Sequence, residues 1–248
     1  FDSYSAAVSD IYQDVFNRSN FMGKGIFDVR AVKETLVDRF PENALLSHDL
    51  IESCFAKSGF LSDTSLVEDF PTSFKSFVSR ENRWVRGDWQ LLPWLCPKIF
   101  NAKGEKIDNP MDALSKWMVF DNLRRSLSSP AFVLLFFLNW FFIGSCKVDV
   151  LILILYFGHL LLEFLSLEKF IVHKIPYMEK VYLSANFVFG KIKLSLSSFV
   201  MVPVNAINKV LAITRTLVRL VEKKHLLEWV THSDAERVIG ENNIIGYF

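Results

Sequence analysis

The chain has 248 residues, of which 51% are hydrophobic and 15% aromatic, and its formal net charge is +1. This charge balance gives no strong field to attract nucleic acid, which is therefore not an expected partner. The mean hydropathy of +0.25 is high for a soluble globular protein. The three cysteines, Cys54, Cys96 and Cys146, include no C-x-x-C pair. This spacing argues against a disulfide framework or a zinc site and predicts buried thiols.

The first part of the chain, residues 1–95, alternates short apolar runs with helical patterns. Mixed short strands and helices of this kind predict an α/β domain. The expected elements are a helix over residues 29–37 capped by Asp28, a helix from Asn43 that stops at Ser58–Gly59, a strand over residues 63–70, and a helix from Phe74 through Trp89.

A polar loop over residues 97–110 follows, and then an amphipathic, aromatic-rich pattern from Met111 to Leu127. This pattern carries Arg124 and Arg125 near its end. A helix of this kind suits the surface of a bilayer, but an ordinary core helix fits the pattern equally well.

Two uncharged apolar runs come next, over residues 131–146 and 150–162. Each is near the lower length limit for crossing a hydrocarbon core of about 30 Å. With only a short charged break between them, they predict a transmembrane hairpin over residues 129–168. A buried helix pair in a soluble core is the alternative. Basic residues flank the hairpin while only Lys147 lies in its turn, which places residues 1–128 in the cytoplasm.

The remaining segment, residues 169–248, contains a weaker apolar stretch from Phe187 to Val204, which is compatible with a re-entrant, an interfacial or a third spanning helix. From Val210 to Val230 a basic amphipathic pattern suits a helix on the anionic cytoplasmic leaflet. The chain opens inside a helical pattern and closes without a stop signal, so we expect it to be an internal piece of a longer polypeptide.

The densest polar and aromatic cluster extends from Arg80 to Gln90. The i, i+3 spacing of its three arginines predicts a compact cationic patch suited to a diphosphate, and its two tryptophans offer flat surfaces for sugar rings. A surface arginine face with core tryptophans is the structural alternative. The residues concerned are Arg80, Arg83, Arg86, Trp84 and Trp89.

A second candidate is Ser47-His48-Asp49, at the start of the expected helix. A carboxylate there can act as the general base of inverting sugar transfer, with the imidazole orienting it, although Ser and Asp are also favoured at helix starts as caps. Gly23-Lys24-Gly25 lacks the spacing of a phosphate-binding Walker loop. No triad, H-E-x-x-H or EF-hand pattern is present, so no metal ligand is assigned.

In chain order, these segments resemble the cyclic β-1,2-glucan synthases. Arg80–Trp84 has the form [QR]-x-x-R-W of processive glycosyltransferases, and its extension to Gln90 resembles the family's R-W-x-R-G-D-W-Q. Further matching segments are Phe21–Asp28, Pro41–Leu50, Arg215–Arg219, Leu226–Trp229 and Ala235–Arg237. Ser53-Cys54 departs from the family, in which a glycine is expected.

The resemblance implies the acceptor-side, C-terminal half of a GT-A domain (residues 1–96), a loop and interfacial helix (97–128), the hairpin (129–168) and a post-membrane segment (169–248). The implied activity is inverting, processive transfer of glucose from UDP-glucose to a growing β-1,2-glucan, with a cyclic product, at the bacterial inner membrane. The alternative is a non-catalytic membrane scaffold or translocation subunit that retains these motifs.

By this resemblance, Asp49 is the catalytic base. The implied substrate-binding residues are His48, Arg80, Arg83, Trp84, Arg86, Asp88, Trp89, Gly23, Lys24 and Gly25. The family also carries, ahead of these segments, a D-x-D motif that holds Mg²⁺ or Mn²⁺ on the diphosphate. No such motif precedes Gly23 here. We therefore expect the cation to be bound by other parts of the intact enzyme, and this chain alone to be inactive.

Overall fold

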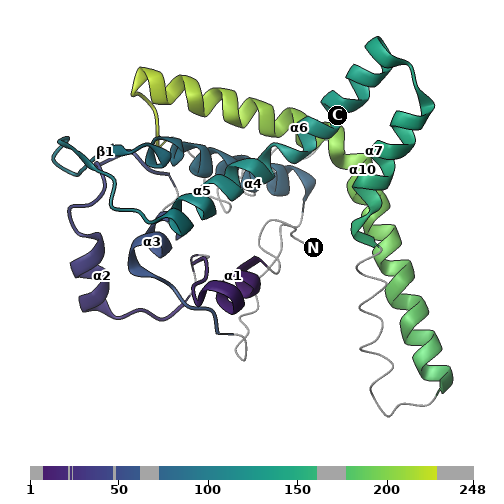
Figure 1. Ribbon diagram of the computed structural model, residues 1–248, viewed down its shortest axis with the longest axis horizontal. Coiled ribbons are helices and arrows are strands. Elements are labelled where there is room, and N and C mark those ends of the chain that lie inside the picture. Colours follow the sequence, from purple (N-terminus) through teal and green to yellow (C-terminus); the bar gives the residue numbers. More distant parts are fainter. Residues whose placement is uncertain are drawn as a thin grey trace. The chain divides into compact units, whose positions relative to one another are not determined.

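The computed structural model describes residues 8–21, 23, 25–46, 49–61, 73–160 and 177–227. This part of the chain is mostly helical and contains one two-stranded antiparallel sheet (Figure 1). It divides into two compact units, unit 1 formed by Phe1–Ser126 with Asn208–Phe248 and unit 2 formed by Leu127–Ile207.

Two helices of unit 1, the second and the fourth, begin where a capping side chain satisfies free backbone N–H groups. Asp28 caps the second helix by accepting from the N–H groups of Arg30 (2.8 Å) and Ala31 (3.1 Å), as predicted. Ser73 caps the fourth helix in the same way. The helices are α1 (Val8–Phe16), α2 (Val29–Leu36), α3 (Asp49–Ala56), α4 (Phe74–Gln90), the 3₁₀ turn η1 (Leu92–Leu95) and α5 (Ala113–Ser126).

Helix α3 begins at Asp49 and not near Asn43, where the sequence predicted it. Asn43 adopts a left-handed backbone conformation (φ 58°), which a right-handed helix cannot accommodate. The stretch from Asn43 to Leu46 is therefore a loop that leads into α3.

The predicted α/β character is not found in the described residues between 8 and 96, which contain no strand. The strand expected over residues 63–70 lies outside the described residues. The only strands described are β1 (Lys98–Phe100) and β2 (Lys106–Asp108), which pair within the predicted polar loop, with Ile99 opposite Ile107. Ile99 is buried, so this short hairpin forms because it contributes a side chain to the core.

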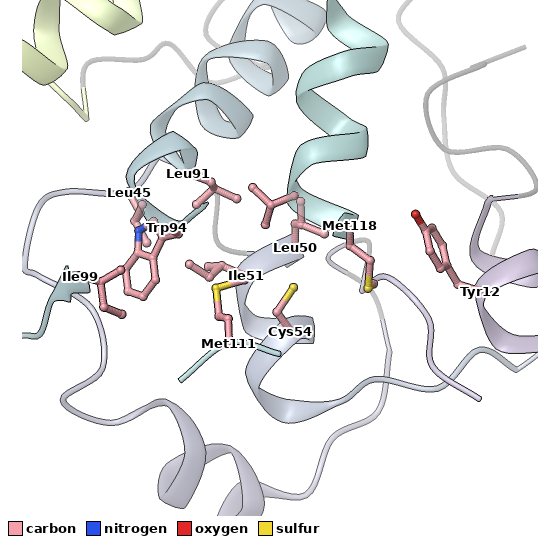
Figure 2. Close-up of a cluster of buried hydrophobic side chains, with 11 residues drawn as sticks. Tyr12, Leu45, Leu50, Ile51, Cys54, Leu91, Trp94, Ile99, Met111 and Met118 are labelled. Atoms are coloured by element: carbon pink, nitrogen blue, oxygen red, sulfur yellow. The ribbon is translucent and has the colours of Figure 1, made fainter. Parts of the chain in front are cut away.

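The main core of unit 1 joins α3, η1, β1 and α5 (Figure 2). The ring of Trp94 packs edge-on against Phe40 and Phe55, with centroids 5.4 and 6.0 Å apart. Met118 and Val119 of α5 are buried here, whereas Trp117 and Phe120 are 50% and 46% exposed. The amphipathic helix predicted over residues 111–127 is thus a core helix with an exposed aromatic face. The buried cluster contains Tyr12, Leu45, Leu50, Ile51, Cys54, Leu91, Trp94, Ile99, Met111, Met118 and Val119.

A second contact in unit 1 packs α4 against the C-terminal part of α10 (Tyr177–Glu222). Val85 is fully buried against Ala212 and Ile213. Beside them, the ammonium of Lys209 lies 3.2 Å from a carboxylate oxygen of Glu81, and both side chains are nearly buried. Helix α4 is therefore fixed along one whole face.

The sequence predicted an apolar stretch and a separate amphipathic helix for the region that α10 occupies. The structure shows one helix that continues through Pro203. Val202 and Ala206 are both buried, so packing on either side of the proline outweighs the loss of one backbone donor. The pattern predicted a helix to Val230, whereas α10 ends at Glu222.

Unit 2 contains the predicted helical hairpin. Its helices are α6 (Ser128–Leu138), the π-helical turn η2 (Asn139–Ile143) and α7 (Cys146–Phe157). The buried Asn139 holds the turn between them by donating to Asp149 Oδ1 (2.7 Å) and to the carbonyl oxygen of Ser145 (3.0 Å). Phe132 and Tyr156 then pack edge-on across the pair.

Within the described residues, the helix long and apolar enough to cross a membrane is Val181–Glu222, judged by length and composition alone. Helices α5 and α6 with η2 pass the same test only if they are counted together as one broken span. The candidate span therefore contains the apolar stretch from Phe187 to Val204, for which the sequence allowed a re-entrant, an interfacial or a spanning helix. Helices α6 and α7 are each too short to qualify separately.

The cysteines only partly follow the prediction of buried thiols. Cys54 is buried, and burial raises the pKa of its thiol to about 11. Cys96 and Cys146 are exposed, so the prediction was wrong for these two. Cys96 directly follows η1 and Cys146 is the first residue of α7, so both lie at the ends of helical elements.

We predict that Arg18→Met lowers the stability of unit 1 by about 2 kcal/mol, because Arg18 makes charge-assisted hydrogen bonds that methionine cannot replace. Its guanidinium donates to Asp112 Oδ2 (2.6 Å), Ser115 Oγ (2.7 Å) and the carbonyl oxygen of Cys54 (3.2 Å). Thermal unfolding of the detergent-extracted full-length protein measures the change. The control is the same substitution at the exposed Arg30, and an equal loss there would contradict the prediction.

Candidate functional site

Asp49, the predicted base, is the first residue of α3 and lies beside the loop that contains Gly23. A Cβ atom built on Gly23 would lie 3.1 Å from Asp49 Oδ2. Gly23 has a φ of +79°, a conformation that side chains other than glycine rarely adopt. The absence of a side chain at Gly23 therefore lets the loop backbone lie directly against the carboxylate.

Arg83 and Arg80 lie on the face of α4 opposite to the one packed on α10, and we call this pair the arginine face. Burial lowers the pKa of Arg83, the charge of Arg80 lowers it further, and the charge of Asp49 partly offsets both effects. The predicted proximity of Asp49 and Arg83 is thus present in unit 1.

Trp84 lies on the same side of α4 and contacts Arg80. The guanidinium of Arg80 is 4.7 Å from the centroid of the Trp84 ring, within cation–π distance. This contact orients Arg80 along the helix. The structure therefore brings together four of the residues predicted for the site, Asp49, Arg80, Arg83 and Trp84, with Gly23 at its edge.

Arg86 lies one helical turn from Arg83 on α4 but is only 7% exposed, so it does not extend the arginine face as an exposed cation. Trp89 lies on the side of α4 that packs on α10. Trp89 donates its indole N–H to Ser126 Oγ (2.8 Å) and packs with Val85 and Leu217. These contacts explain Trp89 as a packing residue between α4, α5 and α10.

Asp88 points toward α5, about 140° around the helix from Arg83. Asn122 of α5 donates to Asp88 Oδ1 (3.2 Å), and Arg125 in turn donates to Asn122. Loss of hydration raises the pKa of Asp88 to about 7, although the bond from Asn122 and the charge of Arg125 oppose this shift. Asp88 thus belongs to a polar network that joins two helices.

Gly25 is exposed, and a Cβ there would lie 3.2 Å from the ring of Phe21. His48 and Lys24 lie outside the described residues, so their predicted roles stay predictions.

The sequence reasoning did not assign a role to Gln90, the last residue of α4. Its side chain is 3% exposed, accepts from the N–H of Leu46 (2.6 Å) and donates to the carbonyl oxygen of Leu226 (2.8 Å). Gln90 is the last residue of the R-W-V-R-G-D-W-Q segment, so the motif that marked the other candidate residues also included this one.

No group of three or more His, Cys, Asp or Glu side chains that could hold a metal ion occurs in the ranges that the structure describes. The binding of Mg²⁺ or Mn²⁺ by other parts of the intact enzyme, which the resemblance implies, therefore stays a prediction.

In unit 1, the carboxylate of Asp49 thus lies near a helix that carries two arginines and a tryptophan. Comparison with known proteins shows what the chain is similar to. The chain is 35% identical over 254 aligned residues to a cyclic β-(1,2)-glucan synthase, NdvB, from Rhizobium meliloti (strain 1021). The aligned region covers 100% of this chain and 8% of the relative. No protein-family model matches the chain.

The resemblance to the cyclic β-(1,2)-glucan synthases is thus confirmed along the whole chain, which is related to one segment of such a synthase. Because this segment spans a small share of the relative's length, the activity of a whole synthase does not transfer to it directly.

We predict that Gly23→Ala disturbs the carboxylate of Asp49, whereas Gly104→Ala does not. Both glycines have positive φ (79° and 74°), so alanine costs about 1 kcal/mol of backbone strain at either position. At Gly104 a Cβ meets nothing within 4 Å. In the full-length protein, Gly23→Ala should lower the thermal unfolding midpoint more than Gly104→Ala does, because only the Cβ at residue 23 meets another side chain. Equal effects would show that strain alone is responsible.

We predict that Asp88→Asn stabilises the protein increasingly as the pH rises from 5 to 8. The folded-state pKa of Asp88 is raised to about 7, so the unfolded chain releases this proton at a lower pH than the folded chain does. The resulting penalty on folding grows with pH up to about 7 and then stays constant. Asparagine has no charge to desolvate. A thermal midpoint difference that does not change between pH 5 and pH 8 would contradict the prediction.

Proposed function

We propose that this chain forms the acceptor side of a UDP-glucose-dependent glucosyltransferase site that extends a β-1,2-glucan with inversion. The proposal is carried by one observation, that Asp49 lies within electrostatic reach of the arginine face of α4. Homology to a glucan synthase over the whole chain supports the choice of a sugar as the transferred group.

Asp49 is the proposed general base. Its carboxylate would accept the proton of the acceptor sugar's hydroxyl group as the hydroxyl oxygen bonds to the anomeric carbon of glucose. The bond between that carbon and the diphosphate oxygen breaks, and UDP leaves with the electron pair. Attack from the face opposite to the leaving group inverts the configuration. Proton removal by a positioned carboxylate contributes about 10²–10⁴-fold to such a rate.

Arg80 and Arg83 are the proposed partners of the leaving diphosphate. Partial burial and the charge of Arg80 both disfavour the charged form of Arg83, while the charge of Asp49 favours it. The proposed diphosphate would add favourable negative charge, and this charge grows as the bond to glucose breaks. Guanidinium groups suit this role because they bind phosphate oxygens with paired hydrogen bonds.

Trp84 is the proposed surface for the acceptor sugar. Arg80 lies over the ring at 4.7 Å, and an indole ring has a second face that can pack against the C–H groups of a sugar. Trp89, in contrast, is already packed against Leu217 and Val85, so it is a less suitable sugar platform.

The lipid bilayer is the proposed environment of the part of α10 before Asn208, at the inner membrane with residues 1–128 in the cytoplasm. The support is the length and apolar composition of Val181–Glu222, together with the resemblance. The remaining parts of a synthase would supply the uridine site and the divalent cation.

We predict that Asp49→Asn in the full-length protein lowers glucan formation from UDP-glucose at least 100-fold, because an amide cannot take up the hydroxyl proton. Incorporation of labelled glucose by isolated membranes measures the change, and immunoblotting checks the amount inserted. The matched control is Asp38→Asn, since Asp38 is exposed and its left-handed backbone (φ 60°) tolerates asparagine.

Near-normal synthesis by Asp49→Asn would refute Asp49 as the base. If the wild-type protein transfers no glucose at all, a non-catalytic membrane scaffold that retains these motifs becomes the better reading.

A further inference from the structure

The side chain of Gln90 joins two backbone segments that are far apart in the sequence. Its Oε1 accepts the N–H of Leu46 (2.6 Å), and its Nε2 donates to the carbonyl oxygen of Leu226 (2.8 Å). At 3% exposure it has almost no contact with water. Both halves of the amide are therefore used, in a buried position.

Few side chains can satisfy both segments at once. The N–H of Leu46 needs an acceptor, and the carbonyl oxygen of Leu226 needs a donor. The position is too buried for a charged side chain without a charged partner. A neutral amide of this length supplies both functions. Replacing it with an apolar side chain leaves two backbone groups without their bonds.

The Leu46 bond controls how the chain enters α3. Leu46 lies three residues before Asp49, and the neighbouring Leu45 and Leu50 are both anchored in the core of unit 1. The N–H of Leu46 is thereby fixed to the same helix that carries Arg83, about two helical turns away. Gln90 thus sets the position of the Asp49 segment relative to the arginine face.

The second bond is to the turn that follows α10. Leu226 lies in this turn, and its neighbour His225 accepts from Arg219 of α10 through its carbonyl oxygen (2.8 Å). The turn is therefore held from two sides, by α10 and by Gln90, and it provides a fixed support for the amide.

We propose that Gln90 is a positioning residue for glucosyl transfer, acting through the Leu46 backbone on Asp49 and depending on the turn at Leu226. This inference rests on the proposed function. It adds that the C-terminal turn supports the site, and that loss of the Gln90 amide impairs catalysis more than it impairs binding of the sugar donor.

The test uses the full-length protein in membranes and compares Gln90→Met with Gln13→Met. Gln13 is the control, because it also accepts a backbone N–H, that of Phe60 (3.0 Å), and donates to Asn17 (3.0 Å), in a more exposed position and with neither partner in α3. The readouts are kcat and KM for UDP-glucose, with the folded amount of each variant determined from its thermal unfolding.

The expected result is a fall in kcat of about tenfold or more for Gln90→Met, with KM for UDP-glucose changed less than threefold, since small displacements of a reacting group reduce rates strongly. Gln13→Met should change neither constant by more than twofold. The inference is overturned if Gln90→Met retains the wild-type kcat per folded molecule, or if Gln90→Met and Gln13→Met lower kcat by the same factor.

Gln90→Glu gives an independent readout through its pH profile. A protonated carboxyl group can accept from Leu46 and donate to Leu226, whereas the carboxylate cannot donate. Burial favours the neutral acid, so the kcat of this variant relative to wild type should be highest at low pH and fall as the pH rises. A ratio that stays constant with pH, or rises, would contradict the proposed role of the amide.

The wild type and Asp49→Asn are measured in the same series to separate the two proposals. If wild type lacks glucosyl transfer, or if Asp49→Asn retains it, the proposed function has failed. If both behave as proposed while Gln90→Met has normal kinetics, only the inference on Gln90 has failed.

Discussion

The packing of α4 is the constraint on which the candidate site depends. One face of this helix is buried, with Val85 against Ala212 and Ile213 and with the Glu81–Lys209 ion pair beside them. Because an α-helix is rigid and repeats every 3.6 residues, fixing that face also fixes the opposite one. The arginine face, Arg80 and Arg83, is therefore held in place by contacts that do not involve the arginines themselves.

The electrostatics of the site follow from this placement. Holding Arg83 partly out of water and close to Arg80 is unfavourable, and the nearby Asp49 compensates for only part of the cost. A carboxylate close to guanidinium groups is suited to a reaction in which a proton is taken up at one end and an anion departs at the other.

Several features escaped sequence reasoning for identifiable physical reasons. The helix expected from Asn43 starts only at Asp49, because a single left-handed residue interrupts it. The loop over residues 97–110 contains a hairpin, since Ile99 finds space in the core. Pro203 does not end its helix, because burial of the residues around it compensates. In each case a tertiary contact or one backbone angle outweighed a local preference.

The sequence by itself determined the motif segments, and with them the family resemblance, the cap at Asp28, the existence of α4 and α5, and the two apolar helices joined by a turn. These depend on local spacing and on residue type, which can be read along one stretch of chain. Only the tertiary structure decided that Asp49 lies near Arg83, that Arg86 is buried, that Asp88 and Trp89 bond to α5, and that Gln90 joins Leu46 to Leu226. Those outcomes depend on which faces are buried when distant segments pack together, and no single segment contains that information.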